Sequence, residues 1–282
     1  MSWRILYRGC LDSCNYDCTY CPFAKYSASK QQLQQDEQQL NRFVNWVEAQ
    51  TVPIRVLFTP WGEALIWSYY QQALIRLAQC DNVQTVCIQT NLSGKLDWLR
   101  RCDTNKLYLW ASYHPDQVTL TGFKQQCELA LRLGAKLSVG SVGLKQHLSA
   151  IQALKQVLPA RTSFWINAYK ETPAYYSKQE IQDFCQIDPF FKLNLASHDS
   201  FDQPCATGES VFTVDGDGNI RRCHFIHDIL GNIYQPNIAS VLTRRNCTAS
   251  SCDCYIGYIH LRALGFPERY GETYFERYRL CP

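Results

Sequence analysis

Three cysteines near the N-terminus have the spacing of a metal-binding loop. Cys14, Cys18 and Cys21 follow a short apolar run in the order C-x3-C-x2-C. Thiolates are soft ligands that select iron–sulfur clusters, copper(I) or zinc. Three protein thiolates leave one iron of a four-iron cluster open to an outside ligand, a vacancy that an electron carrier does not need. We therefore favour a [4Fe–4S] cluster over a zinc ion, which would require a fourth ligand such as Cys10 or a distant histidine.

A second group of cysteines lies in the last third of the chain. Cys205 and Cys223 bracket the run Asp-Gly-Asp-Gly, whose turn chemistry predicts a β-hairpin. The others in this group are Cys247, Cys252, Cys254 and Cys281. Disulfides are rare in the cytosol, and the N-terminus lacks the features of an export signal, so these cysteines are expected to bind metal. Either an iron–sulfur cluster or a zinc ribbon would use four such thiolates.

Strand-like and helix-like segments alternate over the first two thirds of the chain. Strands are expected at 5–9, 54–59, 83–90, 106–113, 135–142 and 162–169. A helix capped by Ser27 or Ser29 is expected to run to about Ala49, and further helices are expected at 68–79, 94–101, 119–133 and 145–157. This order implies right-handed parallel βαβ units. Six strands are too few for a closed eight-stranded barrel, so we expect a partial (β/α)6 barrel with its reacting residues at the carboxyl ends of the strands.

The pattern changes after residue 169, where a further helix at 178–186 leads into the hairpin. We expect two domains: the α/β partial barrel over 1–190 and a small α+β domain containing the hairpin over 191–282. The net charge of +3 over 282 residues argues against a nucleic-acid partner. No run of about 18 apolar residues occurs, so no membrane association is expected, and the protein should be cytoplasmic.

The N-terminal loop resembles the cluster motif of the radical S-adenosylmethionine (AdoMet) superfamily, including aromatic Tyr20 before the last cysteine. The run PWGEAL after the second strand resembles the family's Gly-Gly-Glu-Pro motif, which contacts the amino group of AdoMet. Gly62 and Glu63 occupy matching places, whereas Trp61 replaces the first glycine and Ala64 the proline. The resemblance covers the whole expected barrel in order.

Further residues fall where this family contacts its cofactor or substrate. Asn91 after the third strand and Ser112 at the end of the fourth match positions that contact methionine or ribose. Gly140 after the fifth strand would let the backbone approach adenine, although a glycine turn explains it equally well. Tyr113 and His114 would face the reaction centre, where they could contact substrate or move a proton.

The resemblance also implies a cofactor set. AdoMet on the open iron would be cleaved by one electron to a 5′-deoxyadenosyl radical, which abstracts hydrogen from a substrate. The second cysteine group resembles the shortened auxiliary domain (twitch or SPASM-like) that binds one [4Fe–4S] cluster, so two clusters are expected. Its ligands would be Cys205, Cys223, Cys252 and Cys254, with Cys247 as an alternative to either of the last two and Cys281 free.

The resemblance favours a ribosomally made precursor peptide as the substrate. One alternative is a radical dehydrogenase or tailoring enzyme acting on a small molecule. Another is a non-catalytic iron–sulfur electron carrier, which would leave the three-cysteine site unexplained. Expected partners are an external electron donor and a separate small leader-recognition protein, since neither end of the sequence has room for such a module. The glutamine-rich helix at 31–39 offers one docking face.

Overall fold

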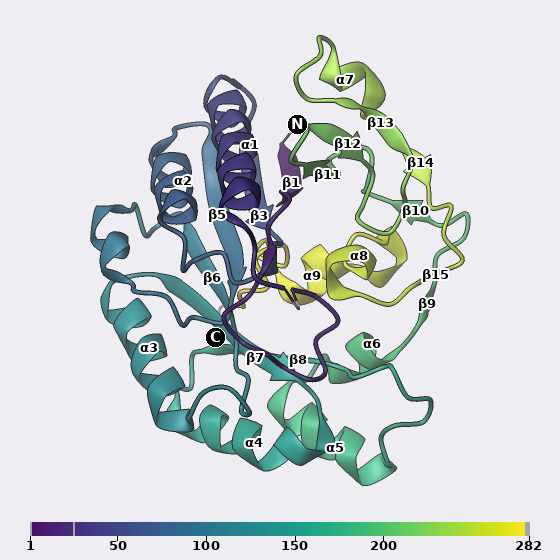
Figure 1. Cartoon of the computed structure of the whole chain (residues 1–282). Coiled ribbons are helices and arrows are strands. Elements are labelled where there is room, and N and C mark those ends of the chain that lie inside the picture. Colours follow the sequence, from purple (N-terminus) through teal and green to yellow (C-terminus); the bar gives the residue numbers. More distant parts are fainter. Residues whose placement is uncertain (1, 25, 280–282) are drawn as a thin grey trace.

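A computed structural model describes residues 2–24 and 26–279, and its centre is a curved parallel sheet (Figure 1). Its six central strands are β1 (Trp3–Arg8), β3 (Ile54–Phe58), β5 (Val83–Thr90), β6 (Leu107–Ser112), β7 (Lys136–Val142) and β8 (Ser163–Asn167). Each pairs in parallel with the next. The predicted partial (β/α)6 barrel is confirmed, with strand bounds within two residues of those expected from hydrophobic patterning.

Helices cover the outer face of this sheet (Figure 1). They are α1 (Lys30–Glu48), α2 (Ser68–Gln79), α3 (Leu120–Arg132), α4 (Leu148–Val157) and α5 (Lys178–Ile187). Helix α1 begins where predicted because Ser29 forms a reciprocal capping box with Gln32. The α-helix expected at 94–101 is instead a 3-10 helix, η1 (Asp97–Arg101), a single tight turn that buries Trp98 and Leu99.

The predicted hairpin is present, but it continues the barrel sheet. Strands β11 (Val211–Asp215) and β12 (Asn219–Arg221) are antiparallel, and β13 (Ile229–Asn232) follows them. Strand β11 also pairs in parallel with β1, from Arg4 opposite Val211 to Arg8 opposite Asp215. The described residues thus form one sheet in the order β13-β12-β11-β1-β3-β5-β6-β7-β8. The domain boundary at residue 190 stays a prediction, although the sheet crosses it.

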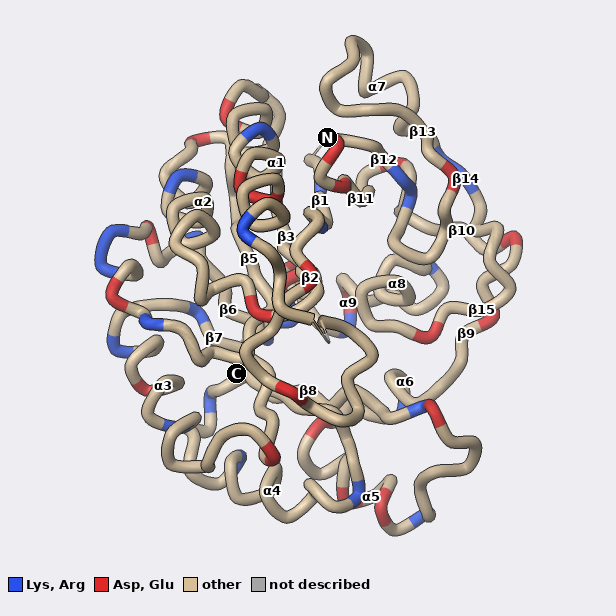
Figure 2. Tube along the Cα trace, in the orientation of Figure 1, with Lys and Arg blue, Asp and Glu red and all other residues tan. Residues whose placement is uncertain are grey.

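Short elements complete the fold. They are β2 (Asp12–Ser13), β4 (Trp61–Gly62), β9 (His198–Asp199), β10 (Pro204–Cys205), β14 (Arg245–Asn246), β15 (Ser251–Cys252), α6 (Phe191–Leu195), α7 (Ile238–Val241), α8 (Tyr255–Tyr258), α9 (Phe266–Tyr270), η2 (Lys145–His147) and η3 (Arg262–Leu264). Charges of both signs are interspersed along the chain (Figure 2). Within the described ranges, no helix combines the length and apolar character that crossing a bilayer requires.

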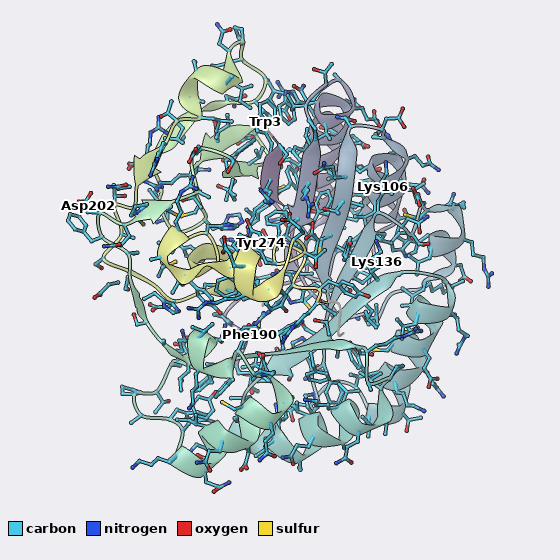
Figure 3. The ribbon with its side chains drawn as sticks, turned by 180° about the vertical axis from the view of Figure 1, so that it is seen from behind. Trp3, Lys106, Lys136, Phe190, Asp202 and Tyr274 are labelled. Carbon is cyan, nitrogen blue, oxygen red and sulfur yellow. The ribbon has the colours of Figure 1, made fainter. Side chains whose placement is uncertain are left out.

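The C-terminal segment, residues 255–278, fills the concave side of the sheet. Figure 3 shows Tyr274 there, and the Arg4 guanidinium lies 5.4 Å from its ring centre. Glu276 is fully buried and forms a salt bridge of 3.3 Å with Arg55 of β3. Aromatic residues of the segment share a core with inward-facing strand residues, among them Tyr255 and Trp110. Burying each such side chain contributes about 1.5–3 kcal/mol. The segment therefore closes the amino-terminal end of the barrel.

Alternation along the strands gives the barrel interior a polar layer at its carboxyl end. The inward residues of the middle layer are Leu6, Leu57, Cys87, Trp110 and Trp165, which belong to the core shared with the C-terminal segment. Residues two positions later face the same side. These form the upper interior layer: Arg8, Thr59, Gln89, Ser112 and Asn167. A polar surface at the carboxyl ends of the strands is where a barrel of this kind binds its ligands.

Candidate active site

The backbone of the cysteine loop lies directly against the Gly-Glu motif. Strand β2 at the start of the loop pairs in parallel with β4, which places Ser13 opposite Gly62. Gly62 has φ +106°, and a Cβ atom there would lie 1.9 Å from the Ser13 carbonyl oxygen. Only glycine permits both the positive φ and this approach. The motif glycine therefore fixes the position of the loop that carries Cys14.

We expect Gly62→Ala to lower the free energy of unfolding by about 2–4 kcal/mol, because the β2–β4 pairing must move apart. Gly265→Ala is the matched control: it also has positive φ (+55°), but its nearest neighbour is the flexible Glu268 carboxylate at 3.3 Å. That variant should lose only about 1 kcal/mol. Urea unfolding of both variants measures the difference, and equal losses would show that the close approach to Ser13 is unimportant.

The three N-terminal cysteines line one cavity of about 240 Å³ at the carboxyl ends of the strands. Predicted site residues that share it are Gly62, Glu63, Asn91, Ser112 and His114. Two residues that the sequence analysis missed, Gln89 and Asn167, also line it. Both stand at inward positions at or next to the ends of predicted strands, so following the alternation to the strand ends could have found them.

Glu63 is buried and directs the loop after β5. Its carboxylate accepts hydrogen bonds from Leu65 N (2.9 Å), Thr90 Oγ1 (2.8 Å) and Asn91 N. Burial raises the pKa of Glu63 to about 7, although these donors oppose the shift. The Asn91 side chain lies 3.9 Å from Cys14 Sγ and 3.0 Å from Asn15 Oδ1. Glu63 thus holds Asn91 toward the cysteine loop.

His114 joins the end of β6 to the cysteine loop. Its Nδ1 lies 2.8 Å from Tyr20 Oη and 3.4 Å from Cys18 Sγ, and the Tyr20 and His114 rings stack. Burial lowers the pKa of His114 to about 4, so the imidazole is neutral at neutral pH. Beyond Tyr20, His147 Nε2 lies 2.9 Å from Asp116 Oδ2. Tyr20 therefore braces the loop through His114.

Two predicted site residues face elsewhere. Tyr113 is 2% exposed and packs against Phe123 of α3, because strand alternation turns it outward between Ser112 and His114. Tyr113 is not among the residues that line the candidate cavity, and its predicted contact with substrate stays a prediction. A Cβ on Gly140 would lie 2.0 Å from the Trp165 ring, so this glycine permits the ring to pack closely against the strand. The predicted approach of the Gly140 backbone to adenine stays a prediction.

The auxiliary cysteines gather on one side of the C-terminal segment. Cys205, Cys223 and Cys247 are buried in a single core, and Cys252 packs against it. Burial raises the pKa of Cys252 to about 12, and the thiols of Cys223, Cys254, Cys247 and Cys205 add to this shift. Likewise, Cys205 and Cys247 contribute to the raised pKa of Cys223, which burial takes to about 11. The Cys252 thiol therefore lies within electrostatic range of four other thiols, with both Cys247 and Cys254 among them.

The Cys254 thiol faces different groups. Burial raises its pKa, whereas Arg277, Arg8 and Lys170 lower it. Cys254 also acts on the Cys252 thiol, so the choice between Cys247 and Cys254 as the fourth ligand stays a prediction. Cys281 lies outside the described residues.

A buried arginine links the segments that carry the auxiliary cysteines. Arg222 is 4% exposed, and its Nε donates to Thr207 Oγ1 at 3.4 Å. Its two other nitrogens donate to the carbonyl oxygens of Asn246 and Arg245, just before Cys247. Thr207 Oγ1 in turn lies 3.2 Å from Cys205 Sγ. A guanidinium placed here would offset the negative charge of a thiolate-bound cluster.

The donor sets fit iron–sulfur chemistry, because both consist of thiols and neither contains a carboxylate. In the described part of the chain, no three His, Cys, Asp or Glu side chains converge as ligands of one metal ion. A cubane takes one thiolate at each iron atom and does not require such convergence. Which cysteines bind iron, and how many clusters form, therefore stay predictions.

Neither a protein-family model nor a curated protein matches the sequence. Solved structures do match. Native anSMEcpe with bound AdoMet and Cp18Cys peptide has a TM-score of 0.56 and 13% identity, covering 86% of this chain and 80% of that chain. Streptococcus suis SuiB has a TM-score of 0.54 and 13% identity, covering 84% and 65%. BtrN in complex with AdoMet and 2-DOIA has a TM-score of 0.48 and 15% identity, covering 85% and 82%. Over most of its length, the chain thus has the fold of the radical AdoMet enzymes.

Proposed function

We propose that this chain is a radical AdoMet enzyme that abstracts hydrogen from a substrate, and that the substrate is a ribosomally made precursor peptide. The observation that carries the first part is the shared cavity. Three thiols that match the cluster motif line it together with Gly62, Glu63, Asn91 and Ser112, the positions matched to AdoMet contacts. A chance cysteine cluster would not explain this meeting of four separate βα units.

The roles of the residues follow from their positions. Cys14, Cys18 and Cys21 would hold a [4Fe–4S] cluster, which with AdoMet supplies a 5′-deoxyadenosyl radical when bound. Asn91 and Ser112 would bind AdoMet through their polar side chains at the cavity wall. Glu63 acts as a positioning residue, because three protein donors occupy its carboxylate. Atoms that react in this cavity of about 240 Å³ would be partly shielded from water by its lining.

An auxiliary [4Fe–4S] cluster would be held by Cys205, Cys223, Cys247 and Cys252. This set takes Cys247 in place of Cys254, because Cys247 shares one buried core with Cys205 and Cys223, and Cys252 packs against that core. Arg222 holds the segments around them by hydrogen bonds to backbone and hydroxyl oxygens. The second cluster would exchange electrons with the substrate or with an external electron donor.

The peptide part of the proposal has separate support. One protein of the same fold has been solved with AdoMet and a peptide bound together. A peptide needs an open approach, and exposed aromatic residues are available beside the cavity: Phe23, 48% exposed, stacks on Trp61, 40% exposed.

A separate leader-recognition protein would then deliver the precursor. Helix α1 is one docking candidate, although Gln39 already bonds Asp217 of the hairpin turn.

We expect the anaerobically reconstituted chain to convert AdoMet to 5′-deoxyadenosine with dithionite, and to change the mass of a precursor encoded by a neighbouring short reading frame. Co-expression with each neighbouring small reading frame, followed by mass spectrometry of the precursor, measures the second result. Modification that requires a second small protein would support the leader-recognition partner. Modification of a free small molecule instead would contradict the peptide substrate but not the radical chemistry.

A further inference from the structure

The loop that carries the three N-terminal cysteines is closed by a side chain at its start. Asp12 belongs to β2 and precedes Cys14 by two residues, and its Oδ1 accepts a hydrogen bond from Ala24 N at 2.9 Å. Cys14, Cys18 and Cys21 all lie between Asp12 and Ala24. One hydrogen bond from a side chain therefore joins the two ends of the segment that holds every thiol of this group.

Ala24 is held in an unusual backbone conformation at the point of closure. Its φ is +53°, in the left-handed region that residues with a side chain rarely adopt. Ala24 is 8% exposed, it lines the candidate cavity, and a Cβ on Gly62 would lie only 3.0 Å from its own Cβ. Backbone strain of this kind persists where the surrounding structure enforces it. The Asp12 carboxylate supplies one such constraint, and contact with Gly62 supplies another.

Two further side chains fix the flanks of the loop. Ser13 is 6% exposed, and its Oγ accepts a hydrogen bond from Ala28 N at 3.3 Å. Ala28 directly precedes Ser29, the N-cap of α1. On the entry side, the buried Asp36 of α1 accepts a hydrogen bond from Leu11 N at 3.0 Å. The loop is thus attached to the start of α1 after the cysteines and to the body of α1 before them.

Closure of the loop matters because three thiolates must reach iron atoms of the same cluster. Fixing the backbone of a flexible segment costs conformational entropy, and a binding site that is ordered beforehand avoids this cost at the moment of binding. Without closure, the ordering of the loop would reduce the free energy with which the cluster is bound. A closed loop therefore retains its cluster more firmly.

We propose that Asp12 is a positioning residue, which closes the cysteine loop in the conformation that binds the cluster. This inference rests on the proposed function, since it concerns the same site. Asp12 acts as the acceptor of the Ala24 N–H group and not as a ligand of iron. Asparagine also offers a carbonyl oxygen as an acceptor, whereas alanine offers none, so only asparagine should replace Asp12.

The test measures how fast an iron chelator, bathophenanthroline disulfonate, removes iron from the reconstituted protein. The phase of iron release that belongs to the N-terminal cluster is identified by its absence from a triple alanine variant of Cys14, Cys18 and Cys21. We expect Asp12→Ala to accelerate this phase about tenfold, the lower end of the range for a hydrogen bond to a charged group. Asp12→Asn should stay within about threefold of the wild-type rate, because a neutral acceptor remains.

Asp103→Ala is the matched control. Asp103 is half-buried like Asp12, and its Oδ1 accepts a hydrogen bond from Asn105 N at 3.0 Å, just before β6 and at the opposite ends of the strands from the cavity. We expect this variant to release iron at the wild-type rate. Urea unfolding of both alanine variants shows whether they lose similar stability, which a merely structural role of Asp12 would predict to be the whole effect.

Three results would overturn the proposal. The first is a wild-type rate of iron release in Asp12→Ala, and the second is equal acceleration in Asp12→Asn, because the charge and not the hydrogen bond would then matter. The third is equal acceleration in Asp103→Ala, which would assign the effect to general stability. The assay requires no turnover, so a wild-type chain that holds the cluster but does not cleave AdoMet would contradict the proposed function alone.

Discussion

Replacing Cys14, Cys18 and Cys21 together with alanine is expected to remove about half of the bound iron and all reductive cleavage of AdoMet. Two cubanes hold about eight irons per chain, and this change removes every protein ligand of one of them. The cavity wall would remain, since Gly62 and Glu63 are held by backbone contacts that do not involve the cysteine side chains. Anaerobic reconstitution, iron determination and chromatography of 5′-deoxyadenosine measure both effects.

The matched control is a triple alanine variant of three half-buried cysteines away from both groups, Cys80, Cys102 and Cys185. It should keep its iron and its activity, because these thiols pack singly against the core or close to it. Production of 5′-deoxyadenosine by the Cys14, Cys18 and Cys21 variant would contradict the central proposal. Loss of iron in the control as well would show that the assay reports general instability.

Cys247→Ala is expected to remove the other half of the iron, whereas Cys254→Ala should leave the iron content close to that of the parent. The reason is the grouping of Cys247 with Cys205 and Cys223 in one buried core, of which Cys254 is not a member. The comparison is closely matched because both changes remove one thiol from the same region. Iron determination and the electron paramagnetic resonance spectrum of the reduced protein distinguish the two clusters.

The opposite outcome would restore the ligand set that the family resemblance implies, with Cys254 in place of Cys247. Loss of the auxiliary cluster in both variants would indicate that ligation depends on the whole segment from β14 to α8. Cleavage of AdoMet should persist in Cys247→Ala, because the N-terminal cysteines lie in a different cavity. The hydrogen bonds from Arg222 to the backbone just before Cys247 would remain in this variant.

The hairpin that precedes Cys223 is joined to the part of the barrel that carries the cysteine loop. Strand β11 pairs with β1, and β1 leads directly into the loop. The hairpin turn also reaches α1, through a hydrogen bond between the side chains of Gln39 and Asp217.

Local patterns in the sequence determined the elements and the chemistry of the main site. The bounds of β5 and α2 follow from alternation and from apolar periodicity, and Ser29 marks the start of α1 by capping. The loop C-x3-C-x2-C and the Gly62–Glu63 pair could be recognised because the residues of each motif lie close together in the sequence at a fixed spacing. In a parallel sheet the carboxyl ends of strands meet at one edge, so the shared cavity was also foreseeable.

The tertiary structure alone decided which way the residues at strand ends point and which distant segments meet. Adjacent residues at a strand end point to opposite faces of the sheet. Tyr113 therefore packs in the outer core, whereas the next residue, His114, lines the cavity. The pairing of β11 with β1 joins residues 207 positions apart, such as Arg4 and Val211, and no local propensity specifies such a contact. The same holds for Arg277, which reaches Asn167 only because the C-terminal segment packs inside the barrel. Burial, hydrogen-bond partners and charge at a site depend on these long-range contacts, whereas sequence spacing records only the near ones.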